Sequence, residues 1–531
     1  MGRNKEKTGR VADLAQMMRR IMIISLLLLA SLGLRAQVYV ATDKNAYVAG
    51  ERIWCSVFCP ADAPVAYLEL VSAEGSAART RIFVRDGRGG GSLSIPFGTP
   101  TGNYMLCAYT GSGDAGSGGP VLAIYNIFST ERVKDGVEIV EAVSGGAHGA
   151  VSVGYGLSAT TSGSIVLENT SGQEMSCCIS LTRGDSLQGD GFRSIAGFSS
   201  GASGLPALGE TLMAELDGKD AAAVAAALDD DPDLYRAFIA VPGSKTDCYA
   251  GVWTGGRFAF NTENIFGDTD MVFLLDGLEP GRDCWLRPVS PFCAPVPEDL
   301  PKLQLCRSQE KDLLRRGKAL AEDLSADSLA VSLPLRREHF FLTHECISYI
   351  LDDYTRFPTM EEVFVEITPN VKLRRPSGKP HVYVLLSTSV LEATPCWGDA
   401  AVMIDGVPVP DHKLIETYDP AIVKVIETYP YKYEMGGRVF DGVVNLVTFK
   451  GNMPGVLFDD NVRIYDFQGC AWPQEHKGSE TPYWHPLVKL MPGESLEIPA
   501  DALQAGVDYI LSVDGLTDGG RPVYLRKTFT R

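Results

Sequence analysis

The sequence predicts a mainly β, multidomain protein that consists of several Ig-like β-sandwiches and one small α+β domain. The length of 531 residues exceeds what one hydrophobic core organises, at roughly 100–200 residues per domain. Short runs rich in Val, Ile, Tyr and Phe recur along most of the chain, with Gly, Asp and Ser between them, which is the pattern of sandwich strands. Only between residues 355 and 452 do helix signals alternate with strands.

The composition is that of a globular and acidic chain. Hydrophobic residues make up 45% and charged residues 21%, which argues against disorder. The net charge of −18 argues against a nucleic-acid partner, because phosphate binding needs a basic face. The one dense acidic run, "DDDP" from Asp229 to Pro232, is interpreted as a solvated turn, since no glycine-spaced ligand loop for calcium surrounds it.

The N-terminus predicts export. A pair of arginines precedes the apolar run "IMIISLLLLASLGL", and the small residue Ala36 follows it. This order is that of a secretory signal peptide, over residues 1–36, with cleavage between Ala36 and Gln37. The apolar run is too short to span a bilayer, and no later stretch of 18 or more apolar residues occurs. We therefore expect an exported protein with no transmembrane helix after signal removal.

Shifts in composition and periodicity divide the rest of the chain. We expect a β-sandwich over 37–132, a second over 133–187, a Gly/Ser/Ala-rich linker over 188–230, a third sandwich over 231–293, a partly helical linker over 294–354, the α+β domain over 355–452 and a C-terminal β-sandwich over 453–531. The run "SQEKDLLRRGKALAEDL" has helical periodicity. Thr359 and Glu362 form a capping box that predicts a helix start in the α+β domain.

The first sandwich carries a motif in "TDKNAYVAGERIW". Its residues are Thr42, Asp43, Lys44, Tyr47, Gly50, Glu51 and Trp54. This stretch resembles the opening strand pair of the macroglobulin-type β-sandwich, although that family often has proline where this chain has Ala49. The resemblance implies structural roles: Tyr47 and Trp54 fill a core, and Gly50 allows a tight turn.

The α+β domain carries a second motif, in "AVMIDGVPVPD" and "GGRVFDGVVNLVTFKG". Its residues are Asp405, Gly406, Pro408, Glu427, Gly437, Gly442 and Asn445. The pattern resembles the plug domain of TonB-dependent outer-membrane receptors. Asp-Gly is also a tight hairpin signal, and glycines beside an apolar strand suit a bent backbone. Because the 80 residues after Gly451 are far fewer than many strands of 9–11 residues require, we expect a plug-like domain without its own barrel.

The order of domains is similar to that of a group of exported Gram-negative proteins, in which macroglobulin-type sandwiches precede a plug-like domain and a terminal β-domain. The resemblance implies a binding or assembly protein in the periplasm or at the periplasmic face of the outer membrane. Its partner would be an outer-membrane β-barrel or another envelope protein. The alternative is a macroglobulin-like protease-binding protein, lacking the thioester because no cysteine lies in a CxEQ-like sequence. Its bait segment would lie within 190–227.

Motifs for catalysis are weak, so we expect no catalytic, cofactor-binding or metal-binding residues and no enzyme. "GFSSG" fits GxSxG but lies in a Gly/Ser-rich stretch without the strand and helix of a nucleophile elbow. A hydrolase that uses Ser199 is kept as a third hypothesis. "GSGDAG" precedes a strand-like run instead of a helix, which removes the phosphate-binding geometry. The seven histidines are scattered and no CxxC pair occurs.

Overall fold

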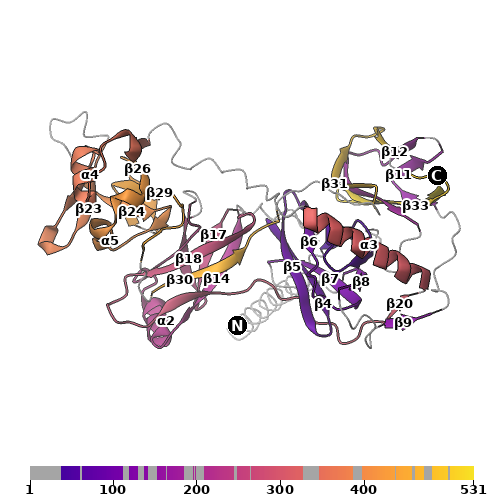
Figure 1. Ribbon diagram of the computed structural model, residues 1–531, viewed down its shortest axis with the longest axis horizontal. Coiled ribbons are helices and arrows are strands. Elements are labelled where there is room, and N and C mark those ends of the chain that lie inside the picture. Colours follow the sequence, from indigo (N-terminus) through magenta and orange to yellow (C-terminus); the bar gives the residue numbers. More distant parts are fainter. Residues whose placement is uncertain are drawn as a thin grey trace, which may run out of the picture. The chain divides into compact units, whose positions relative to one another are not determined.

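The computed structural model describes residues 38–531 except 60–62, 112–118, 129–136, 141–151, 163, 185–194, 196–197, 199–208, 244–247, 264, 306, 327–345, 387–396, 437, 457–460, 472–480, 500 and 502. The expected signal peptide with Ala36 and Gln37, Ser199 and Gly437 lie outside the described residues. The elements are mostly antiparallel strands in several sheets, which confirms the mainly β, multidomain fold class (Figure 1). The chain divides into two compact units. Unit 1 holds 1–206, 294–321 and 473–531, and unit 2 holds 207–293 and 322–472.

The first domain of unit 1, here called sandwich A, is built from eight consecutive strands. They are β1 (Tyr39–Thr42), β2 (Ala46–Val48), β3 (Arg52–Phe58), β4 (Val65–Ser72), β5 (Gly75–Phe83), β6 (Arg88–Ser94), β7 (Gly102–Thr110) and β8 (Val121–Tyr125). One sheet has the order β1-β3-β6 and the other the order β2-β8-β7-β4-β5. Large side chains such as Tyr47, Phe58 and Tyr109 are fully buried and fill the core.

The second domain of unit 1, sandwich B, combines strands from two distant parts of the chain. They are β10 (Ser152–Tyr155), β11 (Leu157–Thr160), β12 (Ile165–Asn169), β13 (Met175–Arg183), β31 (Tyr483–Leu490), β32 (Ser495–Ile498), β33 (Asp508–Thr517) and β34 (Pro522–Thr530). The sheets have the orders β10-β34-β33-β13-β31 and β11-β12-β32.

The structure therefore differs from the two separate sandwiches expected over 133–187 and 453–531. Strand β13 pairs with β33 from Met175↔Thr517 to Arg183↔Tyr509, and it pairs with β31 on its other side. All but its last residue are buried. Because β13 is buried, the N–H and C=O groups along both of its edges need hydrogen-bonding partners. Strands near β13 in the sequence do not supply these partners, and the distant strands β31 and β33 do.

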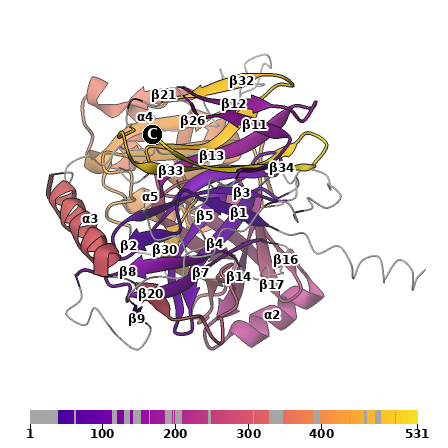
Figure 2. The same cartoon turned by 90° about the vertical axis from the view of Figure 1, so that its right-hand side faces the viewer.

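Helix α3 (Arg307–Ala326) belongs to unit 1 over most of its length instead of serving as a free linker. It lies beside β2 and β8, as Figure 2 shows. Leu313 packs with Val48 and Tyr125 in one buried cluster. A Cβ on Gly317 would come within 2.3 Å of Ile127, so glycine permits this close approach. The short strands β9 (Val137–Ile139) and β20 (Leu303–Leu305) pair in parallel before the helix.

Unit 2 begins with a third sandwich, sandwich C. Its elements are β14 (Glu210–Asp217), α2 (Ala221–Asp230), β15 (Arg236–Ala240), β16 (Cys248–Thr254), β17 (Arg257–Thr262), β18 (Asp268–Asp276), β19 (Trp285–Pro288) and β30 (Val462–Gln468). The strand order is β19-β14-β17-β16-β15-β18-β30. Strand β16 pairs with β15 through its first half and with β17 through its second half, so it joins both parts of the sheet around one core.

Sandwich C extends beyond the expected boundaries of 231–293 in both directions. Val224 and Leu228 lie one turn apart on α2 and are buried in its core, so part of the expected linker over 188–230 is folded. Strand β30, expected in the C-terminal sandwich, pairs with β18 from Asp268↔Gln468 to Leu274↔Val462.

The α+β domain completes unit 2. Its strands are β21 (Ile347–Ile350), β22 (Val371–Arg374), β23 (His381–Leu385), β24 (Trp397–Ile404), β25 (Val407–Pro408), β26 (Val423–Tyr429), β27 (Tyr433–Met435), β28 (Arg438–Phe440) and β29 (Gly442–Thr448). Its helices are α4 (Met360–Glu366), α5 (Lys413–Thr417) and the 3-10 turns η3 (Leu351–Asp353), η4 (Pro376–Gly378) and η6 (Pro420–Ile422).

The main sheet of this domain has the order β21-β26-β29-β24-β23-β22, with β25 added to β24. Helices α4 and α5 lie near β23 and β24 (Figure 1) and bury Met360, Phe364 and Ile415 against this sheet. Thr359 accepts a hydrogen bond from Glu362 N at 3.3 Å, which confirms the predicted helix cap. Ala240 and Val272 of sandwich C belong to the same buried cluster, so the two domains share a core. None of the described helices combines the length and the apolar character that crossing a membrane requires.

Candidate functional site

The plug-like motif forms a buried hydrogen-bond network at the turn between β24 and β25. Asp405 and Gly406 have φ angles of 48° and 83°, the left-handed conformations that a two-residue hairpin turn needs. The Asp405 carboxylate accepts hydrogen bonds from Thr448 N at 2.7 Å, Thr448 Oγ1 at 2.6 Å and Met453 N at 2.8 Å. The turn is thereby tied to the end of β29 and to the loop that follows it.

The other motif residues extend this network. Asn445 Oδ1 accepts a hydrogen bond from Gly406 N at 3.1 Å, and Asn445 Nδ2 donates to Glu427 Oε2 at 3.1 Å. A Cβ on Gly442 would come within 2.3 Å of Val384, so the glycine allows β29 to pass close to β23. Four residues of the motif, Asp405, Gly406, Glu427 and Asn445, are thus brought together. Their polar groups named here bond to one another or to Thr448 and Met453, which is a structural role.

The motif of sandwich A forms a comparable network around Asp43. Asp43 Oδ1 accepts hydrogen bonds from the Tyr47 hydroxyl at 2.7 Å and from Trp54 N at 3.1 Å. On the side of sandwich B, Ser180 Oγ donates to the Asp43 carbonyl and Thr481 Oγ1 donates to Asp43 Oδ2. This buried aspartate therefore fixes the contact between the two sandwiches of unit 1.

Glu51 attaches helix α3 to the same motif. Its carboxylate lies 3.1 Å from Lys44 Nζ and 3.1 Å from Arg316 Nη2, and it accepts a hydrogen bond from Val48 N at 2.9 Å. Burial raises the pKa of Glu51, but Lys44, Arg316 and the Val48 amide outweigh it and lower the pKa to about 2. The adjacent Gly50 has a φ of 94°.

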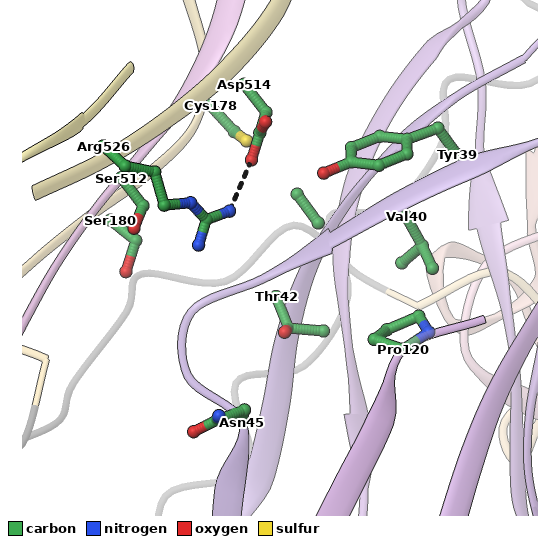
Figure 3. A pocket seen from close by; sticks show the side chains of 11 residues that line it. Tyr39, Val40, Thr42, Asn45, Pro120, Cys178, Ser180, Ser512, Asp514 and Arg526 are labelled. Atoms are coloured by element: carbon green, nitrogen blue, oxygen red, sulfur yellow. Dashed lines mark hydrogen bonds and ion pairs between the residues drawn. The ribbon is translucent and has the colours of Figure 1, made fainter. Parts of the chain in front are cut away.

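A small cavity in unit 1 is lined by the ion pair between Asp514 and Arg526. Figure 3 shows the Arg526 guanidinium directed at Asp514, with the Tyr39 hydroxyl pointing toward the same carboxylate. Burial raises the pKa of Asp514. The cavity measures about 20 Å³, which is room for one water molecule and too little for a substrate.

Cysteines near this cavity behave as core residues. Burial raises the pKa of the Cys177 thiol to about 12 and that of the Cys178 thiol well above its ordinary value. Burial also raises the pKa of Cys55. Because the thiolate is the nucleophile and the metal ligand, these thiols are unsuited to either role. Among the described residues, no group of three or more His, Cys, Asp or Glu side chains is placed to hold a metal ion.

One candidate site is a cleft of about 810 Å³ in unit 2. One wall comes from β18 and the loop that follows it, and the opposite wall comes from β25, α5 and the segment after β29. Its lining includes Val272, Leu274, Leu278, Val407, Pro408, Val409, Leu414, Met453, Val456 and Val462, with Asp276, Glu279, Arg282, Asp411 and Lys413 also among the lining residues. The volume lies within the range of roughly 300–1,000 Å³ that small-molecule sites have.

A second candidate site is the outward face of β22, β23 and β24. Lys372 Nζ lies 3.9 Å from the centroid of the Trp397 ring, and the Arg374 guanidinium lies 5.7 Å from that of Tyr383. The buried alternate residues of these strands point into the core. Cationic and aromatic side chains therefore hold each other in place on an accessible sheet face.

This face continues to a histidine pair. His381 Nδ1 lies 2.8 Å from Asp399 Oδ1, and Arg438 Nη2 lies 2.6 Å from Asp399 Oδ2. The buried His412 accepts a hydrogen bond from Val382 N through Nδ1 at 3.0 Å. Burial and then His381 lower the pKa of His412 to about 4, so this ring is neutral at pH 7.

Sequence reasoning did not identify the cleft or this outward face. The cleft is lined by residues that the fold brings together from 272–282, 407–417, 453–456 and 461–462, and no single stretch shows it. The sequence does contain a pattern that indicates the outward face. In "VKLR" and "HVYVL", apolar residues alternate with Lys, Arg, His and Tyr, which is typical of strands with one exposed face. Of the described residues of the plug-like motif, only Pro408 lines the cleft.

Comparison with known proteins gives little further information. No protein-family model matches the chain, and no curated protein matches it. Matching solved structures include Salmonella alpha-2-macroglobulin reacted with methylamine (9% identity, 94% of this chain and 23% of that chain, TM-score 0.16). They also include Escherichia coli alpha-2-macroglobulin in its native conformation (10% identity, 93% and 22%, TM-score 0.16) and activated by porcine elastase (9% identity, 93% and 30%, TM-score 0.16).

The chain thus spans less than a third of the length of the solved structures that it matches. A TM-score of 0.16 is too low to support an argument about fold or function. The macroglobulin-type and plug-like characters remain resemblances of sequence motifs.

Replacing Glu51 by Gln tests the attachment of α3. Since the pKa of Glu51 is lower in the folded chain, its charge stabilises the fold above the ordinary pKa of about 4.5, and this stabilisation is lost as the pH falls toward about 2. We expect E51Q to lower the free energy of unfolding by about 3 kcal/mol at pH 7, and the difference from wild type to vanish toward pH 2. Urea unfolding across this pH range measures it, with the exposed Glu74→Gln as control. If the difference in the free energy of unfolding between E51Q and wild type does not depend on pH, the charge of Glu51 does not stabilise the fold.

Replacing Asp405 by Asn tests the buried hydrogen-bond network of the α+β domain. The amide keeps the shape but replaces one carboxylate oxygen by an NH2 group, so donor hydrogens face either Thr448 N, which bonds to Oδ1, or Met453 N, which bonds to Oδ2. We expect a loss of about 3 kcal/mol in the free energy of unfolding of unit 2, whereas the exposed Asp411→Asn stays within about 0.5 kcal/mol. If Asp405→Asn and Asp411→Asn change the free energy of unfolding equally in denaturant, the buried network does not contribute to the stability of unit 2.

Proposed function

We propose that this chain is a non-enzymatic, exported cell-envelope protein that serves as a binding or assembly module at the periplasmic side of the outer membrane. Its plug-like α+β domain docks on a partner, either an outer-membrane β-barrel or another envelope protein. The leader-like N-terminus supports export, and the sequence motif around Asp405 supports the plug-like assignment. The docking step rests on the outward face of β22, β23 and β24.

The composition of this face supports protein binding. Trp, Tyr and Arg are the residue types that dominate binding energy in protein interfaces, and Trp397, Tyr383 and Arg374 lie together here. Because the cations rest on the aromatic rings, part of the entropy cost of ordering these side chains is already met before a partner binds.

The charges of the face indicate the character of the partner. Among the described residues of this face, the cations Lys372, Arg374 and Arg438 outnumber the carboxylate Asp399, which His381 and Arg438 both contact. In a chain of net charge −18, this local excess of positive charge favours a partner with an acidic surface.

The macroglobulin-like alternative has less support from the geometry. Its candidate bait segment over 190–227 includes β14 and most of α2, which are built into sandwich C. A bait segment has to be accessible to a protease, and folded core elements are poor substrates. The hypothesis of a hydrolase that uses Ser199 gains no geometric support, since Ser199 lies outside the described residues.

Point variants on the face test the docking proposal without removing a domain that shares its core with sandwich C. We expect Trp397→Ala and Arg374→Glu in the full-length chain each to weaken capture of an envelope partner at least roughly tenfold, the size of an interface hot spot. The measurement is affinity purification from envelope membranes, with quantification of the bound protein. Lys424→Glu, exposed on β26 of the same domain, serves as the charge-matched control.

The outcome decides between two cases. A partner that is retained by Lys424→Glu and lost by both face variants supports docking through this face. A partner that all three variants retain equally contradicts it.

A further inference from the structure

The apolar side chains that line the cleft of unit 2 are of one chemical kind. Its apolar lining consists of Val, Leu, Met and Pro side chains, and the described lining residues include no Phe, Tyr or Trp. Sites for planar ligands use aromatic rings, because stacking orients a flat molecule. A lining of aliphatic side chains and one flexible methionine instead fits a ligand with a flexible aliphatic chain.

Four positions of one wall, Pro408, Val409, Pro410 and Lys413, offer no free main-chain N–H group. Pro408 and Pro410 have no N–H group. Val409 N donates to Val402 O at 2.8 Å, and Lys413 N donates to Asp411 Oδ1 at 2.9 Å. A peptide that adds as a further strand needs donors at alternate positions, so this wall disfavours such a peptide and favours a ligand held by apolar contact.

The opposite wall is rigid. Val272 and Leu274 belong to β18, which pairs with β15 on one side and β30 on the other. Both side chains are buried. Asn461 Nδ2 donates to Leu275 O at 2.7 Å and joins the end of this wall to the start of β30. The cleft is therefore held open by two paired elements, and a ligand need not create it.

The charged lining residues carry both signs. Asp276 is paired with Arg236, and Arg282 lies 3.5 Å from Asp220. Glu279 and Lys413 are exposed and carry no ion pair among the described residues. A polar head group can remain in water among these residues, and because Glu279 and Asp411 line the cleft together with Lys413, the lining does not select the sign of its charge.

We propose that this cleft is a binding site for a single aliphatic chain with a polar head group, the chemistry shared by a free fatty acid and an acyl chain on a larger molecule. The volume of about 810 Å³, the aliphatic lining and the solvated charges together carry the assignment. This site is separate from the outward face of β22, β23 and β24, so the proposal stands independently of partner docking.

Binding of saturated carboxylates to the full-length chain tests the proposal. Octanoate, decanoate, dodecanoate and tetradecanoate are titrated below their micelle concentrations and followed by calorimetry and native mass spectrometry. We expect one ligand per chain and an affinity that rises up to about fourfold per methylene group, until the cleft is filled. A dodecanoylated tripeptide and dodecanoate distinguish an attached from a free acyl chain, and naphthalene-2-sulfonate tests selectivity against a planar ligand.

Two variants test whether the ligand binds in the cleft. Leu414→Arg and Val409→Asp each put a charge on a half-buried wall residue, and we expect each to weaken dodecanoate binding at least tenfold. Val365→Arg, at an exposed position of α4, is the control and retains binding. Circular dichroism verifies that each variant is folded. The proposal is overturned if dodecanoate does not bind saturably, if affinity does not depend on chain length, or if a folded Leu414→Arg or Val409→Asp variant binds as wild type does.

Discussion

The pairing of β13 with β33 and β31 is the constraint on which the architecture depends. β13 is buried along nearly its whole length, so both of its edges need backbone partners, and these come from the last part of the chain. The chain therefore has to leave sandwich B after residue 184 and return to it at residue 481. All of unit 2 and the helix α3 lie between these points, so sandwich B cannot be completed until the chain has returned.

Two buried aspartates organise the units on a smaller scale. In unit 1, Asp43 accepts hydrogen bonds from β3, from Tyr47 and from sandwich B. In unit 2, Asp405 ties a hairpin turn to the end of β29. Each is the center of a sequence motif, and each is satisfied by fixed donors, as buried carboxylates require. The recognisable motifs thus explain how the domains hold together, whereas the binding roles that we propose rest on the cleft and the outward face.

Local features of the fold could be predicted from the sequence, and non-local ones could not. The cap at Thr359, the turn at Asp405 and Gly406, and helix α3 depend on residues a few positions apart, and the structure has all three. Alternation of apolar residues identifies a strand but does not name its partner. For this reason the strands of 133–187 and 453–531 were assigned to two domains, and β30 was separated from β18. The cleft could not be predicted either, because segments that are distant in the sequence line it and the sequence does not show which segments meet.

Hydrogen exchange of β13 is the most direct test of the central claim that the two chain segments form one domain. The Val513→Asp variant places a charge in the buried center of β33. We expect the amides of β13 to lose protection together with those of β31 and β33, while those of β16 and β17 in sandwich C stay protected. Retained protection of β13 beside an unprotected β33 would contradict it, because the segment from 152 to 184 would then fold without its distant partners.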